Sequence, residues 1–261
     1  MAYLNWRGNR IFYLTASPNS GEDTATVLCI HGAGGNCRHW AHQLAVCDDW
    51  GYRIIAVDLP GHGHSAGEPL DSIDAYSSFV EELIQLLDLK RPILAGHSMG
   101  GAIAMELAAR QPDILSGLIL IGTLDQFAVA PWLLESLQSG VMPMSFIRLA
   151  YHKNADEKLL EQATREAEKV SAPTYLTDFL ACQSFRLSAT KELRHIPCLV
   201  LFGAGDRLTP VDRAKDLGRF FPGYQLAVVQ EAGHMVMLEQ KDKVNNIIKD
   251  FLQTSLEHSK E

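Results

Sequence analysis

A serine at the apex of a tight turn is the first residue in this 261-residue chain whose surroundings suggest chemistry. Residues 96–100 read Gly-His-Ser-Met-Gly, after a short apolar run and before a run rich in small residues. This order indicates a buried strand, a sharp turn and a helix. Flanking glycines make the strained backbone of such a turn possible, and the serine hydroxyl then stands clear of its neighbours. The pattern therefore predicts that Ser98 is a nucleophile.

A serine hydroxyl is a weak nucleophile at neutral pH, so it needs a base, and the base needs a partner that orients it. Asp206 and His234 each follow an apolar run typical of a buried strand. Loops at the carboxyl ends of parallel strands converge on one crevice, and the order Ser, Asp, His is typical of hydrolases with this turn. We predict that His234 is the base and that Asp206 orients it. Asp125, just after the run 118–122, is the alternative acid.

Acyl transfer also needs hydrogen-bond donors for the oxygen that becomes negative. One donor is expected at the residue after the nucleophile, and a second in the loop after an earlier strand. We predict the backbone N–H groups of Met99 and Ala33, with Gly34 as the alternative to Ala33. Ala33 lies in the glycine-rich run 31–35, which follows the apolar run 26–30. An ordinary turn is the other interpretation of that run.

Strands alternating with helices would bring these loops together. The expected strands are 3–7, 10–16, 26–30, 53–57, 93–97, 118–122, 198–203 and 225–229. The expected helices are 40–47, 72–89, 132–139, 154–170, 174–185 and 236–252. Two further helices are expected to begin at Met99 and after Thr209, and Asn154 and Thr209 are the expected N-caps of their helices. This alternation predicts right-handed crossovers and a mainly parallel sheet in an α/β fold.

The alternation is interrupted between residues 123 and 190, where no convincing buried strand occurs. We therefore predict a core domain formed by 1–122 and 191–261, with 123–190 as an all-helical insertion. The aromatic and methionine side chains of this insertion, Trp132 and Phe146 among them, suit an apolar lid that sets substrate choice. Two of its arginines, Arg148 and Arg186, can meet a substrate carboxylate, although solvated surface is the expectation for each.

The composition excludes several classes of protein. Acidic residues outnumber basic ones by 31 to 23, for a net charge of −8, which argues against a nucleic-acid or anionic-membrane partner. The first residues lack the apolar run of a secretory signal, and no apolar run is long enough to cross a bilayer. The five cysteines include no C-x-x-C pair, and the histidines show no metal-ligand spacing. We expect a reducing, cytoplasmic setting without disulfides or a metal site.

These motifs together resemble those of the α/β-hydrolase superfamily, in the serine-nucleophile branch with a helical cap after the sixth strand. The resemblance covers nearly the whole chain and is carried by 31–34 (HGAG), 58–65 (DLPGHGHS), 96–101 (GHSMGG), Gly205-Asp206 and Gly233-His234. It implies an eight-stranded, mainly parallel sheet whose second strand is antiparallel, with no cofactor and no metal. Serine at the nucleophile position sets the chain apart from haloalkane dehalogenases and epoxide hydrolases, which use aspartate there.

The function expected from these residues and this resemblance is hydrolysis of a small-molecule carboxylic ester or lactone. Two alternatives keep the same three side chains. One is a hydrolase of carbon–carbon bonds in vinylogous diketones from aromatic degradation, and the other is a small-molecule receptor, which would show slow or single turnover. Sequence alone leaves open the acyl and leaving groups and the oligomeric state.

Overall fold

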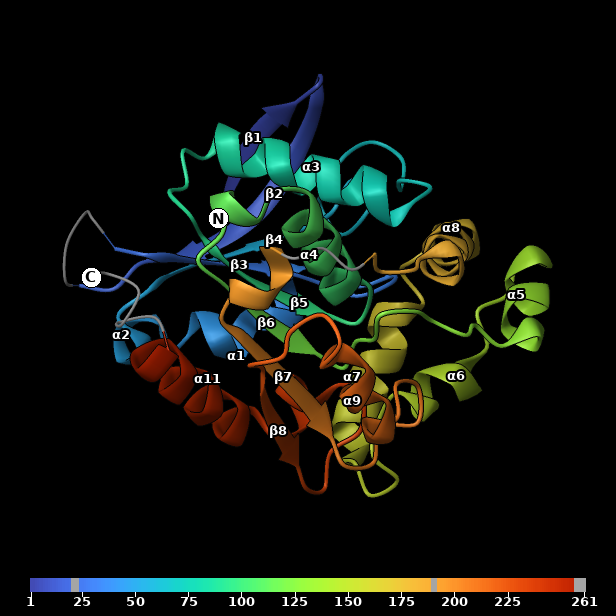
Figure 1. The fold of residues 1–261 in the computed structure, drawn as a ribbon. Coiled ribbons are helices and arrows are strands. Elements are labelled where there is room, and N and C mark those ends of the chain that lie inside the picture. The colour runs from blue at the N-terminus through green and yellow to red at the C-terminus, as the bar shows by residue number, and fades with distance from the viewer. Residues whose placement is uncertain (20–23, 189–191, 256–261) are drawn as a thin grey trace.

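The computed structural model describes residues 1–19, 24–188 and 192–255, and an eight-stranded sheet runs through its centre (Figure 1). The strand order is β1-β2-β4-β3-β5-β6-β7-β8. The strands are β1 Ala2–Trp6, β2 Asn9–Ala16, β3 Thr26–Ile30, β4 Arg53–Val57, β5 Ile93–His97, β6 Gly117–Ile121, β7 Cys198–Gly203 and β8 Gln225–Val229. β2 is antiparallel to both of its neighbours, whereas β3 to β8 are parallel. The predicted α/β fold class is therefore confirmed.

Helices cover both faces of the sheet (Figure 1). They are α1 Ala41–Leu44, α2 Cys47–Trp50, α3 Ile73–Leu86, α4 Met99–Arg110, α5 Pro131–Gln138, α6 Met144–Leu149, α7 Glu157–Ala167, α8 Ala172–Ser184, α9 Ala214–Leu217, α10 Val236–Glu239 and α11 Lys241–Ser255. Tyr76 and Phe79 of α3 belong to the core of one face, with α4, while Trp50 of α2 and Phe251 of α11 belong to the core of the other. Within the described ranges, no helix is long and apolar enough to cross a membrane.

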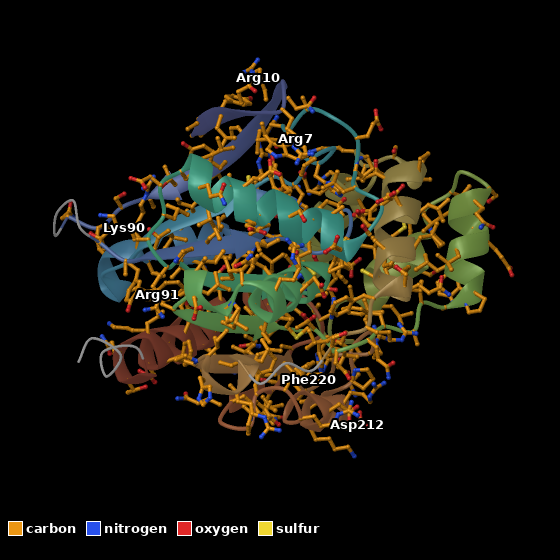
Figure 2. The ribbon with its side chains drawn as sticks, turned by 45° about the horizontal axis from the view of Figure 1, so that its top comes forward. Arg7, Arg10, Lys90, Arg91, Asp212 and Phe220 are labelled. Carbon is orange, nitrogen blue, oxygen red and sulfur yellow. The ribbon has the colours of Figure 1, made fainter. Side chains whose placement is uncertain are left out.

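Helices α5 to α8 follow β6 and precede β7, and we call them the helical insertion. Figure 2 shows Lys90 and Arg91, in the loop before β5, on the opposite side of the molecule from α5 and α8. The insertion therefore lies beyond the carboxyl ends of the strands, where the predicted catalytic loops also lie. Its limits at 123 and 190 remain a prediction, and the limit at 190 falls outside the described residues.

Four local expectations were wrong. The helix expected at 236–252 is divided at Gln240 into α10 and α11. The helix expected at 40–47 is broken into a 3-10 turn followed by the short helices α1 and α2. Helix α7 begins after Asp156 rather than Asn154, because the Asp156 carboxylate accepts the N–H of Lys158. Thr209 does not cap a helix: the 3-10 turn Val211–Arg213 starts after Pro210, one residue later, and the Thr209 hydroxyl donates to Asp206.

Candidate active site

Ser98 sits between β5 and α4 in a strained backbone conformation, with φ 53° and ψ −117°. Its N–H donates to the carbonyl of Ile121 at 2.9 Å, and its carbonyl accepts the Thr123 hydroxyl at 2.8 Å. Both partners lie at or just after the end of the neighbouring strand β6. A non-glycine residue keeps such a conformation only when its surroundings impose it, and these two bonds help to do so.

Gly96 and Gly100 leave no room for side chains around this turn. A Cβ at Gly96 would lie 2.2 Å from the carbonyl oxygen of Gly100, and a Cβ at Gly100 would lie 2.3 Å from that of Ile30. Backbone atoms block both positions, so no side-chain rotation would relieve the contacts. The two glycines around Ser98 are therefore a packing requirement of the turn.

His234 and Asp206 form a buried pair beside this turn. His234 Nδ1 donates to Asp206 Oδ2 at 2.9 Å, and the two residues are 5% and 6% exposed. Asp206 Oδ1 accepts the backbone N–H groups of Leu208 and Thr209, each at 2.9 Å, and Oδ2 also accepts the Thr209 hydroxyl at 2.6 Å. Burial opposes ionisation of Asp206, but the charge and hydrogen bond of His234, with those of Thr209, outweigh it and lower its pKa. An ionised Asp206 keeps the proton on His234 Nδ1 and leaves Nε2 as an acceptor.

The alternative acid lies elsewhere. Asp125 Oδ2 accepts a hydrogen bond from Arg219 at 2.8 Å, and Asp125 Oδ1 lies 3.9 Å from Arg213. The carboxylate is thus held by two arginines rather than by a histidine. Of the two candidate acids, the structure brings only Asp206 into contact with His234.

A cavity of about 370 Å³ joins Ser98 and His234 to the helical insertion. Its apolar wall comes mainly from the insertion and includes Met142, Phe146, Ile147, Ala150, Tyr151, Leu159, Tyr175 and Phe179. Polar side chains at the cavity include Arg38, His39 and Gln162. The Ser98 hydroxyl makes no hydrogen bond with the described residues, which is common before a substrate tightens the site.

The insertion residues expected at the site divide between cavity and surface. Phe146 lines the cavity as expected, whereas Trp132 is 46% exposed, is not part of the cavity wall and packs edge-on against Phe146. Arg148 pairs with Glu157 at 2.7 Å on the surface. Arg186 donates to nearby backbone carbonyls, and neither arginine lines the cavity.

The candidate oxyanion donors differ in their hydrogen bonds. The N–H of Gly34 donates to Asp178 Oδ2 at 2.8 Å, so it is already occupied. In the part of the chain that the structure describes, the N–H groups of Ala33 and Met99 have no acceptor. Ala33 also lines the cavity, and Met99 is the first residue of α4, where helix N–H groups lack partners within the helix. The geometry therefore favours the N–H of Ala33 over that of Gly34 as the oxyanion donor that acts together with the N–H of Met99.

The loop that carries His234 is fastened to the insertion, which the sequence did not suggest. The carbonyl of Ala150 accepts the N–H of His234 at 2.8 Å. The Glu239 carboxylate bridges the two segments by accepting the N–H groups of Gly233 and His152, at 2.8 and 2.7 Å. The contact of Ala150 with His234 shows no sequence signal, because it joins two backbone groups, and Glu239 lies in no motif that would mark its carboxylate as a bridge.

Two further histidines near the site support backbone groups. His97 Nε2 donates to the carbonyl of His234 at 3.0 Å, and His31 donates through Nδ1 to Gly32 while accepting the N–H of Leu59. Burial, more than neighbouring histidines, lowers the pKa of both His97 and His31, so both are neutral at neutral pH. Among the described residues, no group of three or more His, Cys, Asp or Glu side chains is arranged to hold a metal ion.

Comparison with known proteins agrees with the fold. The model of a family described as "Alpha/beta hydrolase family" matches residues 27–247. An acetyltransferase component of the acetoin cleaving system from Pseudomonas putida is 27% identical over 246 residues, which cover 89% of this chain but only 65% of that protein. A 2-hydroxy-6-oxononadienedioate/2-hydroxy-6-oxononatrienedioate hydrolase from a Pseudomonas species is 26% identical over 258 residues, which cover 90% of this chain and 90% of that protein. The solved structure of a thermophilic esterase is 27% identical, with a TM-score of 0.82 over 97% of this chain and 96% of that one.

Proposed function

We propose that this chain, which belongs to the alpha/beta hydrolase family, is a serine hydrolase that cleaves the acyl–oxygen bond of a small-molecule carboxylic ester or lactone. The observation that carries the proposal is the buried His234–Asp206 pair next to the strained turn at Ser98, with Ser98 and His234 in the wall of one cavity. The thermophilic esterase of similar sequence and fold supports an ester over other bonds.

In the proposed reaction, the Ser98 hydroxyl attacks the substrate carbonyl while His234 Nε2 takes its proton. The oxygen that becomes negative accepts hydrogen bonds from the N–H groups of Ala33 and Met99. The carbon–oxygen bond then breaks, and the leaving alkoxide takes the proton from His234, so that an acyl group remains on Ser98. Water repeats the attack with the same proton transfers in the second half of the reaction. Asp206 keeps the His234 ring oriented and stabilises its cation throughout.

The cavity supports a small substrate with an apolar group. A volume of about 370 Å³ lies at the lower end of the range for small-molecule sites. Phe146, Phe179 and Met142 present apolar area on the insertion side. We therefore expect the acyl or the alcohol part of the substrate to be apolar.

Hydrolysis of a carbon–carbon bond is the second candidate. The Pseudomonas hydrolase is similar in length to this chain, and the substrate in its name is a dicarboxylate. Arg38 is the one lysine or arginine among the described residues at the cavity, and it can meet such a carboxylate. A substrate that carries an acid group would favour this candidate.

A panel of substrates tests the proposal: p-nitrophenyl esters of short and long acids, a lactone and a vinylogous diketone, each assayed with wild type, Ser98→Ala and His234→Ala. We expect repeated turnover of esters, with kcat lowered roughly 10⁶-fold in either variant. Turnover of the diketone alone would favour the second candidate, and one product per chain would indicate a receptor. Ester hydrolysis retained by folded Ser98→Ala would rule out the mechanism.

A further inference from the structure

A buried cluster of polar groups joins helix α8 of the insertion to the loop that carries Ala33. Its centre is Asp178, which is 0% exposed. Asp178 Oδ2 accepts the N–H of Gly34 and a hydrogen bond from His62 Nε2, each at 2.8 Å, and Oδ1 accepts the Tyr76 hydroxyl at 2.8 Å. Three donors from three separate segments therefore hold one carboxylate of the insertion.

His62 is the cationic partner of this carboxylate. Its Nδ1 lies 3.0 Å from the carbonyl of Pro60, so both ring nitrogens face acceptors and both must carry a proton. Burial opposes this charge, but the hydrogen bond and the charge of Asp178 outweigh it and raise the pKa of His62. Breaking a buried ion pair leaves an uncompensated charge, so the pair fixes Asp178 firmly in place.

The same helix also packs on Gly34 itself. A Cβ at Gly34 would lie 1.9 Å from the ring of Tyr175, and the φ of Gly34 is +61°. Tyr175 precedes Asp178 by three residues, so the two side chains lie on one face of α8. Together they hold Gly34, Tyr175 by packing on the backbone and Asp178 by accepting its N–H.

We propose that Asp178 is a positioning residue for the oxyanion hole. By accepting the N–H of Gly34, it fixes the peptide next to Ala33, a residue that lines the cavity and whose own N–H has no acceptor among the described residues. The helical insertion thereby becomes part of the catalytic machinery as well as a wall of the cavity. This inference rests on the proposed serine-hydrolase function, since an oxyanion hole has a purpose only there.

The kinetic test compares Asp178→Ala with Asp178→Asn, because the asparagine oxygen can still accept the N–H of Gly34. We expect Asp178→Ala to lower kcat by roughly 10- to 100-fold, with KM within about threefold, as for a small displacement of an oxyanion donor. Asp178→Asn should restore most of kcat. The matched control is Asp125→Ala, which removes another buried carboxylate that pairs with an arginine away from the cavity, and its kcat should stay at the wild-type value.

Three kinetic results would overturn the proposal. They are a folded Asp178→Ala variant with unchanged kcat, an effect confined to KM, and equal losses of kcat in the alanine and asparagine variants. The last result would mean that the charge of Asp178 matters and its contact with Gly34 does not.

Amide hydrogen exchange by NMR tests the same contact without any activity. In wild type the Gly34 amide should exchange slowly and the Ala33 amide rapidly, and Asp178→Ala should remove the protection of Gly34. Rapid exchange of Gly34 in wild type would overturn the proposal. If Asp178→Ala does not fold, the wild-type exchange rates of these two amides decide. If no ester is turned over, the proposed function fails, and exchange still shows whether Asp178 holds Gly34.

Discussion

Replacing Asp206 with asparagine should trap His234 with its proton on the wrong nitrogen. In wild type, Asp206 Oδ1 accepts two backbone N–H groups, from Leu208 and Thr209, at 2.9 Å each. The amide oxygen of asparagine must take this place, because an NH₂ group there would face two donors. The NH₂ group then occupies the Oδ2 position, 2.9 Å from His234 Nδ1 in wild type, and donates to it. His234 must carry its proton on Nε2, where it cannot accept the proton of Ser98.

The loss should be large because no nearby group reverses this arrangement. The Thr209 hydroxyl lies 3.2 Å from His234 Nδ1 and now donates to Asp206 Oδ2. Facing an NH₂ group, it would accept from the amide and be free to donate to His234 Nδ1, which favours the same unproductive tautomer. Loss of the right tautomer lowers kcat by about 10⁴-fold in a serine protease, or about 5.4 kcal/mol of transition-state stabilisation. We expect a similar loss here.

The assay is the steady-state kcat on the best ester of the panel, with folding checked by circular dichroism and thermal melting. Asp125→Asn is the control, since its carboxylate contacts Arg219 instead of a histidine, and it should stay within about threefold of wild type. An Asp206→Asn enzyme within about tenfold of wild type would refute the tautomer argument. A large loss in Asp125→Asn alone would assign the acid to Asp125.

Two other predictions concern the insertion and the effect of pH. Phe146→Ala should change the ratio of kcat/KM between short and bulky acyl esters by roughly 10- to 200-fold, because Phe146 lines the cavity. Trp132→Ala, at an exposed position, should leave this ratio nearly constant. Equal losses of kcat/KM on both esters in folded Phe146→Ala would mean that the insertion helps to assemble the catalytic site instead of selecting the acyl group. Burial lowers the pKa of His31 and His97 in the folded state. Below about pH 6.5 the unfolded chain therefore binds more protons at these two histidines than the folded chain does. The free energy of unfolding falls as pH falls, by up to about 1.4 kcal/mol per pH unit for each histidine. The raised pKa of His62 acts in the opposite direction: its contribution is complete below about pH 6.5 and is lost as pH rises from there through the raised pKa, so a comparison that starts above about pH 6.5 includes an offset from His62. Urea unfolding at about pH 6.5 and about pH 5.5 therefore measures the loss from His31 and His97, and equal stability at both would contradict it.

The strands and the turn around Ser98 could be predicted because their signals are local. Five-residue strands such as Ile93–His97 are buried along their whole length, and the glycines on either side of Ser98 meet backbone atoms that belong to the turn or to the neighbouring strand. Asp206 and His234 could be proposed because parallel strands place their following loops on one edge. The structure then brings the two side chains into hydrogen-bond contact.

The proposed role of Asp178 could not be predicted from the sequence. It lies within a helix without any motif, and its partners Gly34, His62 and Tyr76 are 144, 116 and 102 residues away. Only the packing of α8 on the sheet domain brings them together. The Thr209 error has a related cause: its hydroxyl donates to Asp206, a contact set by the fold of this loop, and the following 3-10 turn starts after Pro210 with no side-chain cap.

Intact-protein mass spectrometry after reaction with a fluorophosphonate tests the central claim, that Ser98 is a nucleophile activated by His234. Such a reagent forms a stable bond with an activated serine, so the expected result is one adduct per chain, mapped by peptide sequencing to Ser98. The adduct should be absent in Ser98→Ala and should form far more slowly in His234→Ala. Equal labelling of Ser98→Ala, or an unlabelled wild type that still hydrolyses esters, would contradict the account.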